Sequence, residues 1–452
     1  MTLNEKTCVP LGAECPSLTY IEVPSSSISL RSLDREKQLD HDVERVIKEE
    51  SHQISSGKDQ PQVSIDPAPD GGFQAWLAVA GGFCTAFASF GWINCIGIFQ
   101  NYYQSNQLKS YSPSIISWIP STESYMLFFF GLVAGKMTDT IGPRWPLLLG
   151  SFLHVFGLMM ASVSNKYYQI FLAQGLCSAI GCSFLFFPTI AAVGTWFSAR
   201  RALAFGIMLA GSSIGGVVLP IMINHLIPKI GFGWTMRVVA FIMLALLVFA
   251  NLAVKSRLPP SKRKVRPQDF VTPFKEPAFL LLVVGAFFVY LGGFLPFTFI
   301  IVQAEAGGMS RQLAGYLVPI LNAASTLGRI IPGYLGDRYG VFNVMIIFTT
   351  FAGIISFALW LPASGNAAII TFAALYGVAS GTTLSILAAL VAQISDVRDL
   401  GLRTGVMYAS SSIGVLVGSP IAGAIVASQD GSFSGLKVFC GATLLIGAVV
   451  TI

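Results

Sequence analysis

The segment Gly135-Lys-Met-Thr-Asp-Thr-Ile-Gly142 occurs a second time in the chain, in altered form, as Gly333-Tyr-Leu-Gly-Asp-Arg-Tyr-Gly340. Both copies share the pattern Gly-x-x-x-Asp-x-x-Gly, and they begin 198 positions apart. A second pair of similar segments, 206–215 and 405–414, repeats at an offset of 199. Two matches at nearly one offset are hard to obtain by chance. The chain is therefore predicted to contain two copies of one structural unit.

The composition predicts that both copies lie in a lipid bilayer. Hydrophobic residues make up 54% of the 452-residue chain and charged residues only 11%, whereas a water-soluble protein needs enough polar groups to cover its surface. Apolar runs of about 20 residues cross the roughly 30 Å hydrocarbon core as helices, because open sheet edges are not stable in lipid. Twelve runs are predicted, near residues 74–99, 113–134, 146–164, 168–193, 202–227, 235–254, 278–302, 313–333, 343–362, 367–391, 403–427 and 437–452.

These runs predict the domain organisation. Residues 1–69 are hydrophilic and are expected to form a disordered cytoplasmic tail. Residues 70–254 are expected to form a first six-helix bundle, 255–277 a basic cytoplasmic linker, and 278–452 a second six-helix bundle. The predicted fold class is an all-α membrane protein whose twelve transmembrane helices form two six-helix bundles related by pseudo-two-fold symmetry. The last run spans about 16 residues, so its helix is expected to be short.

The Lys and Arg residues in the loops predict the orientation. They gather in the loops on one side, which is the side of both termini, and they occur singly in the loops on the other side. Positively charged loops stay in the cytoplasm, so both termini of this multi-pass protein are expected there. The residues on the predicted inner side are Lys136, Arg144, Arg200, Arg201, Lys255, Arg257, Lys262, Arg263, Lys264, Arg266, Lys275, Arg338 and Arg398.

Other function classes find little support in the sequence. No Gly-rich loop ends in Gly-Lys-Ser or Gly-Lys-Thr, so ATP is not expected to drive the protein. No basic stretch interleaved with aromatic residues suggests nucleic acid. The four histidines are scattered and no Cys/His cluster has metal-ligand spacing, so neither a metal, nor another cofactor, nor an enzyme active site is expected. The expected partners are the lipid bilayer and a small organic solute, and ion or solute gradients remain as the energy source.

Arg329 and Glu123 are charged side chains within predicted runs, where a charge is costly and therefore suggests function. The planar guanidinium of Arg329 suits a carboxylate or enolate of an anionic solute; the alternative is a side chain that reaches back to the lipid headgroups. Glu123 is a candidate for proton coupling, or a partner of Arg329 when the site is empty. The alternative for Glu123 is a hydrogen-bonded structural carboxylate.

The repeated segment itself is predicted to act in gating. Gly135 allows two helices to approach closely, and Gly142 permits a tight reversal of the chain. Asp139 can cap the start of a helix and pair with a basic neighbour such as Arg144. A charged contact that exists in one state and is broken in another biases a two-state equilibrium. The alternative is a solvated turn. The equivalent residues of the second copy are Gly333, Asp337 and Arg338.

The repeated segment is similar to the signature of the Major Facilitator Superfamily, and the resemblance covers about residues 70–452. The opening Pro69-Asp-Gly-Gly-Phe-Gln-Ala-Trp76 looks like the Asp-Gly-Gly entry of its monocarboxylate porter branch. The segments 212–220 and 321–332 also match, and the whole pattern is similar to the fungal members. The resemblance implies the two-bundle fold, a plasma-membrane setting, and substrates that are organic acids or secondary metabolites.

Two positions depart from the proton-coupled animal members of that branch. Those members carry a lysine where this chain has Asn94, and an aspartate one turn before the arginine, where this chain has Ser325. The departures favour a substrate other than lactate or pyruvate, although Arg329 is kept. The predicted substrate-binding residues are Arg329, Asn94, Ser325, Asn322, Tyr290, Phe294 and Tyr376.

The leading prediction is a secondary active transporter that works by alternating access and exports a fungal secondary metabolite. An importer of a monocarboxylate or a related metabolite is the alternative within the same class. A non-transporting nutrient sensor built on the same fold is the alternative from another class. The tail of about 70 residues carries no recognisable signalling module, which gives the sensor little support.

Overall fold

The computed structural model describes residues 67–260 and 266–451. Most of the predicted tail 1–69, the linker residues Lys262, Arg263 and Lys264, and Ile452 lie outside these residues. Every regular element among the described residues is a helix, as the apolar runs predict.

The first half consists of α-helices and two short π-helical segments that are continuous with them. In order they are α2 (Phe73–Ala86), the π-helix η1 (Phe87–Gly91), α3 (Ile96–Ser105), α4 (Pro113–Phe129), α5 (Gly131–Ile141), α6 (Arg144–Val163), α7 (Tyr167–Ile170), the π-helix η2 (Phe171–Ser178), α8 (Ala179–Gly194) and α9 (Arg201–Ala253).

The described end of the linker and the second half follow the same pattern. In order they are α10 (Gln268–Val271), η3 (Thr272–Lys275), α11 (Pro277–Gly293), α12 (Leu295–Ala306), α13 (Arg311–Ala314), α14 (Leu317–Tyr339), α15 (Val341–Ile355), the π-helix η4 (Ser356–Trp360), α16 (Asn366–Gln393), η5 (Val397–Asp399), α17 (Leu400–Ser428) and α18 (Ser434–Val450).

Eight helical stretches among the described residues are long and apolar enough to cross a membrane. One of them, α9, has 53 residues and contains Gly231 at φ 77°, a conformation that other residues rarely adopt. Gly231 therefore turns the chain between the predicted runs 202–227 and 235–254. The predicted runs 113–134 and 313–333 form helices that are not among the eight, and α18 has 17 residues.

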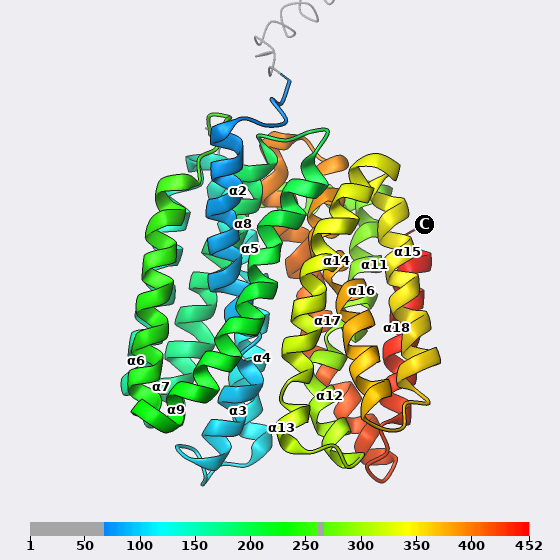
Figure 1. Ribbon diagram of the computed structural model, residues 1–452. Helices are drawn as coiled ribbons and strands as arrows, with labels where there is room; N and C mark the ends of the chain where they lie inside the picture. The colour runs from blue at the N-terminus through cyan, green and yellow to red at the C-terminus, as the bar shows by residue number, and fades with distance from the viewer. Residues whose placement is uncertain (1–66, 261–265, 452) are drawn as a thin grey trace, which may run out of the picture. The chain divides into compact units, whose positions relative to one another are not determined.

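The two halves lie side by side. Figure 1 shows the helices of the first half, coloured blue to green, on one side, and the helices of the second half, which run to yellow and red, on the other. Two helix pairs join them: α9 packs on α14, and α5 packs on α17. Since the repeat relates α5 to α14 and the start of α9 to the start of α17, the two contacts are equivalent.

Small residues bring the backbones of these pairs together. A Cβ atom on Gly405 of α17 would overlap the carbonyl oxygen of Gly131 in α5, and a Cβ atom on Gly206 of α9 would overlap the carbonyl oxygen of Arg329 in α14. Gly135 likewise lies against the backbone of Gly401, so the predicted close approach is present. Close backbone contact through small residues is a common means of packing membrane helices.

Gly405→Ala tests this packing. The added methyl group overlaps the Gly131 carbonyl, and overpacking of this kind costs about 1–3 kcal/mol, so we expect a lower melting temperature of the purified protein in detergent. Gly423→Ala is the matched control, because Gly423 lies on the same helix with open space around its Cα and gains helix propensity. Equal melting temperatures for the two variants would contradict the proposed contact.

Candidate functional site

A cavity of about 60 Å³ lies between elements of both halves. All seven side chains predicted to bind substrate line it, although they come from three helices, the turn after η1 and the junction of α11 with α12: Asn94, Tyr290, Phe294, Asn322, Ser325, Arg329 and Tyr376. Asn322, Ser325 and Arg329 share one face of α14, because positions i, i+3 and i+7 line up on a helix. The structure thus places together residues that the sequence separates by more than 280 positions.

Arg329 is the only cationic residue that lines the cavity among the described residues. Its side chain is 6% exposed, and one terminal nitrogen donates to the carbonyl oxygen of Leu209 and to the hydroxyl of Ser212, both on α9. The guanidinium therefore joins the two halves instead of reaching back to lipid headgroups. Its Nε has no hydrogen-bond partner among the described residues, which leaves a donor on a buried charge.

The polar wall of the cavity also crosses between the halves. The hydroxyl of Ser325 lies 2.7 Å from that of Ser213. A Cβ atom on Gly216 would lie 2.7 Å from both the Oδ1 of Asn322 and the Nδ2 of Asn94. Only glycine lets the two amides approach one another at this point, so an amide from each half meets at the wall of the cavity.

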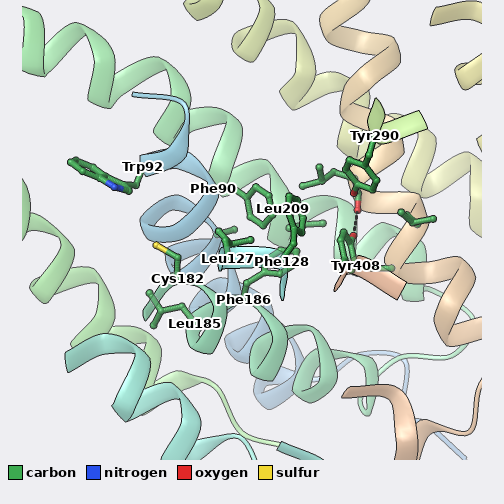
Figure 2. Packing of buried hydrophobic residues seen from close by; sticks show 14 of the residues in the cluster. Phe90, Trp92, Leu127, Phe128, Cys182, Leu185, Phe186, Leu209, Tyr290 and Tyr408 are labelled. Atoms are coloured by element: carbon green, nitrogen blue, oxygen red, sulfur yellow. Dashed lines mark hydrogen bonds between the residues drawn. The ribbon is translucent and has the colours of Figure 1, made fainter. Parts of the chain in front are cut away.

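Aromatic rings separate this polar wall from the rest of the first half. Figure 2 shows Phe90, Phe128 and Phe186 of the first half against Tyr290 and Tyr408 of the second, with the two tyrosine hydroxyls directed toward one another. The rings of Phe128 and Tyr408 have centroids 5.6 Å apart, and their planes are nearly parallel. Of these rings only Phe90 and Tyr290 line the cavity, and the others are buried behind them.

The second half supplies a further aromatic wall. The rings of Tyr290 and Phe294 stack with centroids 5.7 Å apart, and the hydroxyl of Tyr376 donates to the carbonyl oxygen of Gly293 at 2.9 Å. That bond holds α16 against the end of α11, where the chain bends into α12. The predicted aromatic residues thus shape the cavity as well as line it.

Several lining residues were not predicted. Phe90 lies one turn before Asn94, so the helical period around that residue would have identified it, whereas Ile93, the adjacent residue, follows no such period. Ser380 and Thr383 of α16 carried no such signal, because hydroxyl side chains in apolar helices usually bond to their own backbone.

Glu123 has different partners from those expected. Its carboxylate is fully buried and accepts hydrogen bonds from the indole nitrogen of Trp92 at 2.6 Å and from the amide of Gln174 at 3.0 Å. It does not line the cavity. The prediction that Glu123 pairs with Arg329 is therefore wrong for this structure, in which the two groups bond to different residues: Glu123 to Trp92 and Gln174, and Arg329 to Leu209 and Ser212.

Asp139 caps a helix of the opposite half. Its two carboxylate oxygens accept from the backbone N–H groups of Gly401 at 3.0 Å and Leu402 at 2.7 Å, in the first turn of α17. The N-cap residue of that helix, Asp399, makes no capping bond with its own side chain. A carboxylate in this position satisfies free N–H groups and faces the positive end of the helix dipole.

Asp337 makes the equivalent contact. Its oxygens accept from the backbone N–H groups of Ala202 and Leu203, both at 2.9 Å, in the first turn of α9. Here too the N-cap residue, Arg200, gives no side-chain capping bond. The two contacts, called the cap contacts below, join the halves at the end of the molecule where α2 begins (Figure 1).

The predicted basic partners of the two aspartates are not the residues that bind them. Arg144 is exposed at the start of α6, and the guanidinium of Arg338 lies 5.7 Å from the ring centre of Tyr339. The expectation of a charge pair is corrected to a carboxylate bound by backbone N–H groups. Gly142 and Gly340 have φ values of 84° and 97°, which permit the tight reversals that the repeated pattern predicts.

The described end of the linker is fastened beside one cap contact. Lys136 of α5 pairs with Asp269 of α10 at 2.8 Å, and Arg403 of α17 pairs with Glu276 just before α11. The hydrogen bond from Lys136 holds the pKa of Asp269 below its usual value, and the hydrogen bond from Arg403 does the same for the pKa of Glu276. The linker therefore contacts both helices that the Asp139 cap joins.

The entry motif docks at the same end. Asp70, with φ 51°, accepts from the backbone N–H groups of Ser198 at 2.6 Å and Arg200 at 3.2 Å. These residues form the loop that leads into α9. The Asp-Gly-Gly sequence thus places the start of α2 against the loop that precedes the helix capped by Asp337.

Replacement of the capping aspartates tests the cap contacts. Asp139→Asn keeps an acceptor but loses the charge, and loss of a helix cap costs about 0.5–2 kcal/mol. We expect a cysteine placed at the buried Leu402 position to react faster with maleimide in the Asp139→Asn background, and a cysteine at Leu203 to do so with Asp337→Asn.

Asp430→Asn is the control for that experiment, because Asp430 is exposed beyond the far end of α17 and its positive φ suits asparagine. Unchanged labelling in both capping variants would show that the aspartates do not hold the halves together.

Comparison with known proteins identifies the family. The family model described as Major Facilitator Superfamily matches residues 81–365 and 282–452. The chain is 52% identical over 396 residues to "MFS-type transporter 1" of Ophiocordyceps sp. (strain BCC 1869), covering 87% of this chain and 88% of that one. It is 43% identical over 383 residues to "Fujikurins efflux protein" of Gibberella fujikuroi, covering 84% and 82%.

Solved structures agree in fold. The transporter FucP in the outward conformation superposes with a TM-score of 0.66 at 14% identity, covering 83% of this chain and 98% of that chain. A bacterial homologue of the iron transporter ferroportin, in the outward-facing state, gives a TM-score of 0.65 at 13% identity, with 84% and 98% covered. Likeness at this identity concerns the fold alone. From the family model and the relatives, the chain belongs to the Major Facilitator Superfamily of integral membrane transporters.

Proposed function

We propose that this protein is a secondary active transporter that exports a secondary metabolite by alternating access. The observation that carries the proposal is the cavity between the halves, with one buried guanidinium and walls from both repeats. Relatives named as efflux proteins for fujikurins, agnestins and aspyridones support an exporter. These relatives come from fungi, so we propose a fungal secondary metabolite as the solute.

The arrangement in the membrane is part of the proposal. Eight stretches qualify as spans, Gly231 divides one of them in two, and α4 with α5, α14 and α18 bring the number to twelve. We propose that they form two bundles, 70–254 and 278–452, related by pseudo-two-fold symmetry. The equivalence of the two cap contacts supports that symmetry.

The distribution of Lys and Arg supports cytoplasmic termini in the plasma membrane, with 1–69 as the tail and 255–277 as the linker. The cap contacts then lie on the cytoplasmic side. In this proposal they close the inner entrance while solute leaves outward, and they break when the inner entrance opens to load solute. Gly135, Asp139, Gly142, Arg144, Gly333, Asp337 and Arg338 form the gating segments in the proposal.

The cavity supports an anionic solute with an apolar body. Arg329 offers a donor that is not used within the protein, and aromatic rings from both halves line the remaining space. We propose that the protein is a member of the monocarboxylate porter branch. Its substrates are expected to differ from lactate, because Asn94 and Ser325 stand where the animal members have a lysine and an aspartate. We propose that protons, and not ATP, drive transport. Glu123 is the proposed group that binds the coupled proton.

Comparative metabolomics of cells and medium tests the function. Disruption of the gene should raise the amount of one acidic metabolite inside the cells and lower it in the medium, and re-expression should reverse both changes. The opposite movement would indicate the importer, and no movement of any solute would contradict transport and favour the sensor.

Arg329→Lys tests the recognition of the anion. Lysine keeps the charge but loses the planar fork of donors, so the apparent affinity for an anionic solute should fall about tenfold, which corresponds to about 1.4 kcal/mol. Arg237→Lys is the matched control, because Arg237 contacts Ser162 and Trp234 away from the cavity. Equal affinity in Arg329→Lys and the parent protein would assign Arg329 a structural role.

A further inference from the structure

A chain of buried hydrogen bonds lies outside the cavity, within the first half. The hydroxyl of Tyr103 on α3 donates to the Oε1 of Gln174 on η2 at 2.6 Å. The amide nitrogen of Gln174 donates to the Oε2 of Glu123 on α4 at 3.0 Å. The indole nitrogen of Trp92 donates to the Oε1 of Glu123 at 2.6 Å. Every member is at most 1% exposed.

Among the described residues, the titratable groups around Glu123 include no Lys or Arg that could neutralise it. Cys95, in the turn before α3, and Tyr103 on α3 face it, and Cys182 faces it from α8. Across Trp92 lies the ring of His154 on α6, with ring centroids 6.2 Å apart; this ring contacts the hydroxyl of Ser178 and the thiol of Cys182.

The remaining elements packed on α4 place their charged or titratable groups elsewhere. On α17, Tyr408 stacks on Phe128 of α4. On η2, Cys177 donates to the carbonyl oxygen of Leu153. On α5, Lys136 pairs with Asp269 in the linker. A carboxylate at this depth without a cation is costly when charged, which favours a group that takes up a proton.

The chemistry of Gln174 allows the chain to exist in two arrangements. In this structure both oxygens of Glu123 accept hydrogen bonds, which suits a carboxylate. Trp92 can only donate, whereas an amide can donate or accept and a phenol can do both. A half turn of the Gln174 amide would direct its carbonyl oxygen to Glu123 and its nitrogen to Tyr103. Glu123 would then donate through a proton on Oε2, and Tyr103 would accept.

We propose that Glu123, Gln174 and Tyr103 form a proton-binding switch that is separate from the solute cavity. Hydronium from the aqueous side gives one proton to the carboxylate, which becomes a carboxylic acid and leaves water. No bond between heavy atoms forms or breaks. The amide of Gln174 rotates, and Tyr103 keeps its own proton while it changes from donor to acceptor.

Trp92 connects the switch to the cavity. It directly precedes Ile93 and Asn94, which line the cavity, and the helix is interrupted at Asn94 and Cys95. A hydrogen bond to a charged carboxylate is about twice as strong as one to a neutral acid. Proton uptake therefore weakens the hydrogen bond by which Glu123 holds Trp92 and the interrupted segment that follows it. This consequence rests on the proposed transport cycle, whereas the proton binding itself does not.

Infrared difference spectroscopy of the purified full chain in lipid nanodiscs tests the switch. A step from mildly alkaline to acidic pH should produce a carbonyl band of the protonated Glu123 carboxylic acid, beside the bands of other carboxylates that titrate, and a shift of one tyrosine band. Both signals should disappear in Glu123→Gln. The tyrosine shift alone should disappear in Tyr103→Phe and in Gln174→Leu, because the amide transmits the change.

Glu305→Gln is the matched control, since Glu305 is an exposed carboxylate near the end of α12, and it should leave both signals in place. A carboxylic acid signal that is equal in Glu123→Gln and the parent protein, or a tyrosine shift that persists in Gln174→Leu, would overturn the switch. Tyr103→Phe removes one oxygen atom only, so it reports even if a larger change impairs folding.

A transport assay separates the switch from the proposed function. Glu123→Gln should flatten the pH dependence of efflux. If both infrared signals behave as expected while no efflux is detectable, the switch stands and the exporter assignment fails. If efflux occurs but the signals are absent, the exporter stands and the switch is wrong.

Discussion

Two carboxylates that bind the first turn of a helix in the opposite half are the contacts on which the rest of the structure depends. Asp139 and Asp337 each accept two backbone N–H groups from a helix that lacks a side-chain cap of its own. Glycines on the same helices bring the backbones close enough for these bonds. A main-chain cap exists only at close range, so separation of the helices would break it, as the proposed gating requires.

The proposed gate and the cavity share one helix, α14. Asp337, Gly333 and Arg329 lie on one side of α14, and the eight positions from Arg329 to Asp337 correspond to about 12 Å along the helix. Arg329 also bonds to α9, the helix that Asp337 caps. Movement of α14 against α9 must therefore change both contacts, which physically connects the occupancy of the cavity to the state of the gate.

Much of this could be predicted from the sequence, because apolar runs, glycine spacing and a charge in a membrane span are local signals. The helices and the grouping of the α14 side chains follow from such patterns. A cap by Asp139 was also expected, but which helix it caps was not, because the free backbone N–H groups of a distant helix have no sequence signature. Gln174 was also missed, since an uncharged amide in an apolar run attracts no notice, and its bond to Glu123 joins positions 51 residues apart.

The distance between the halves at the capped end tests the central claim most directly. Spin labels at Ile141 on α5 and Gln393 on α16, both exposed at that end, report it by pulsed electron resonance in lipid nanodiscs. The account predicts one dominant short distance in the parent protein and a growing population at longer distance when Asp139 and Asp337 are both changed to asparagine. The same distance distribution in both proteins would contradict the claim that the two carboxylates hold the gate closed.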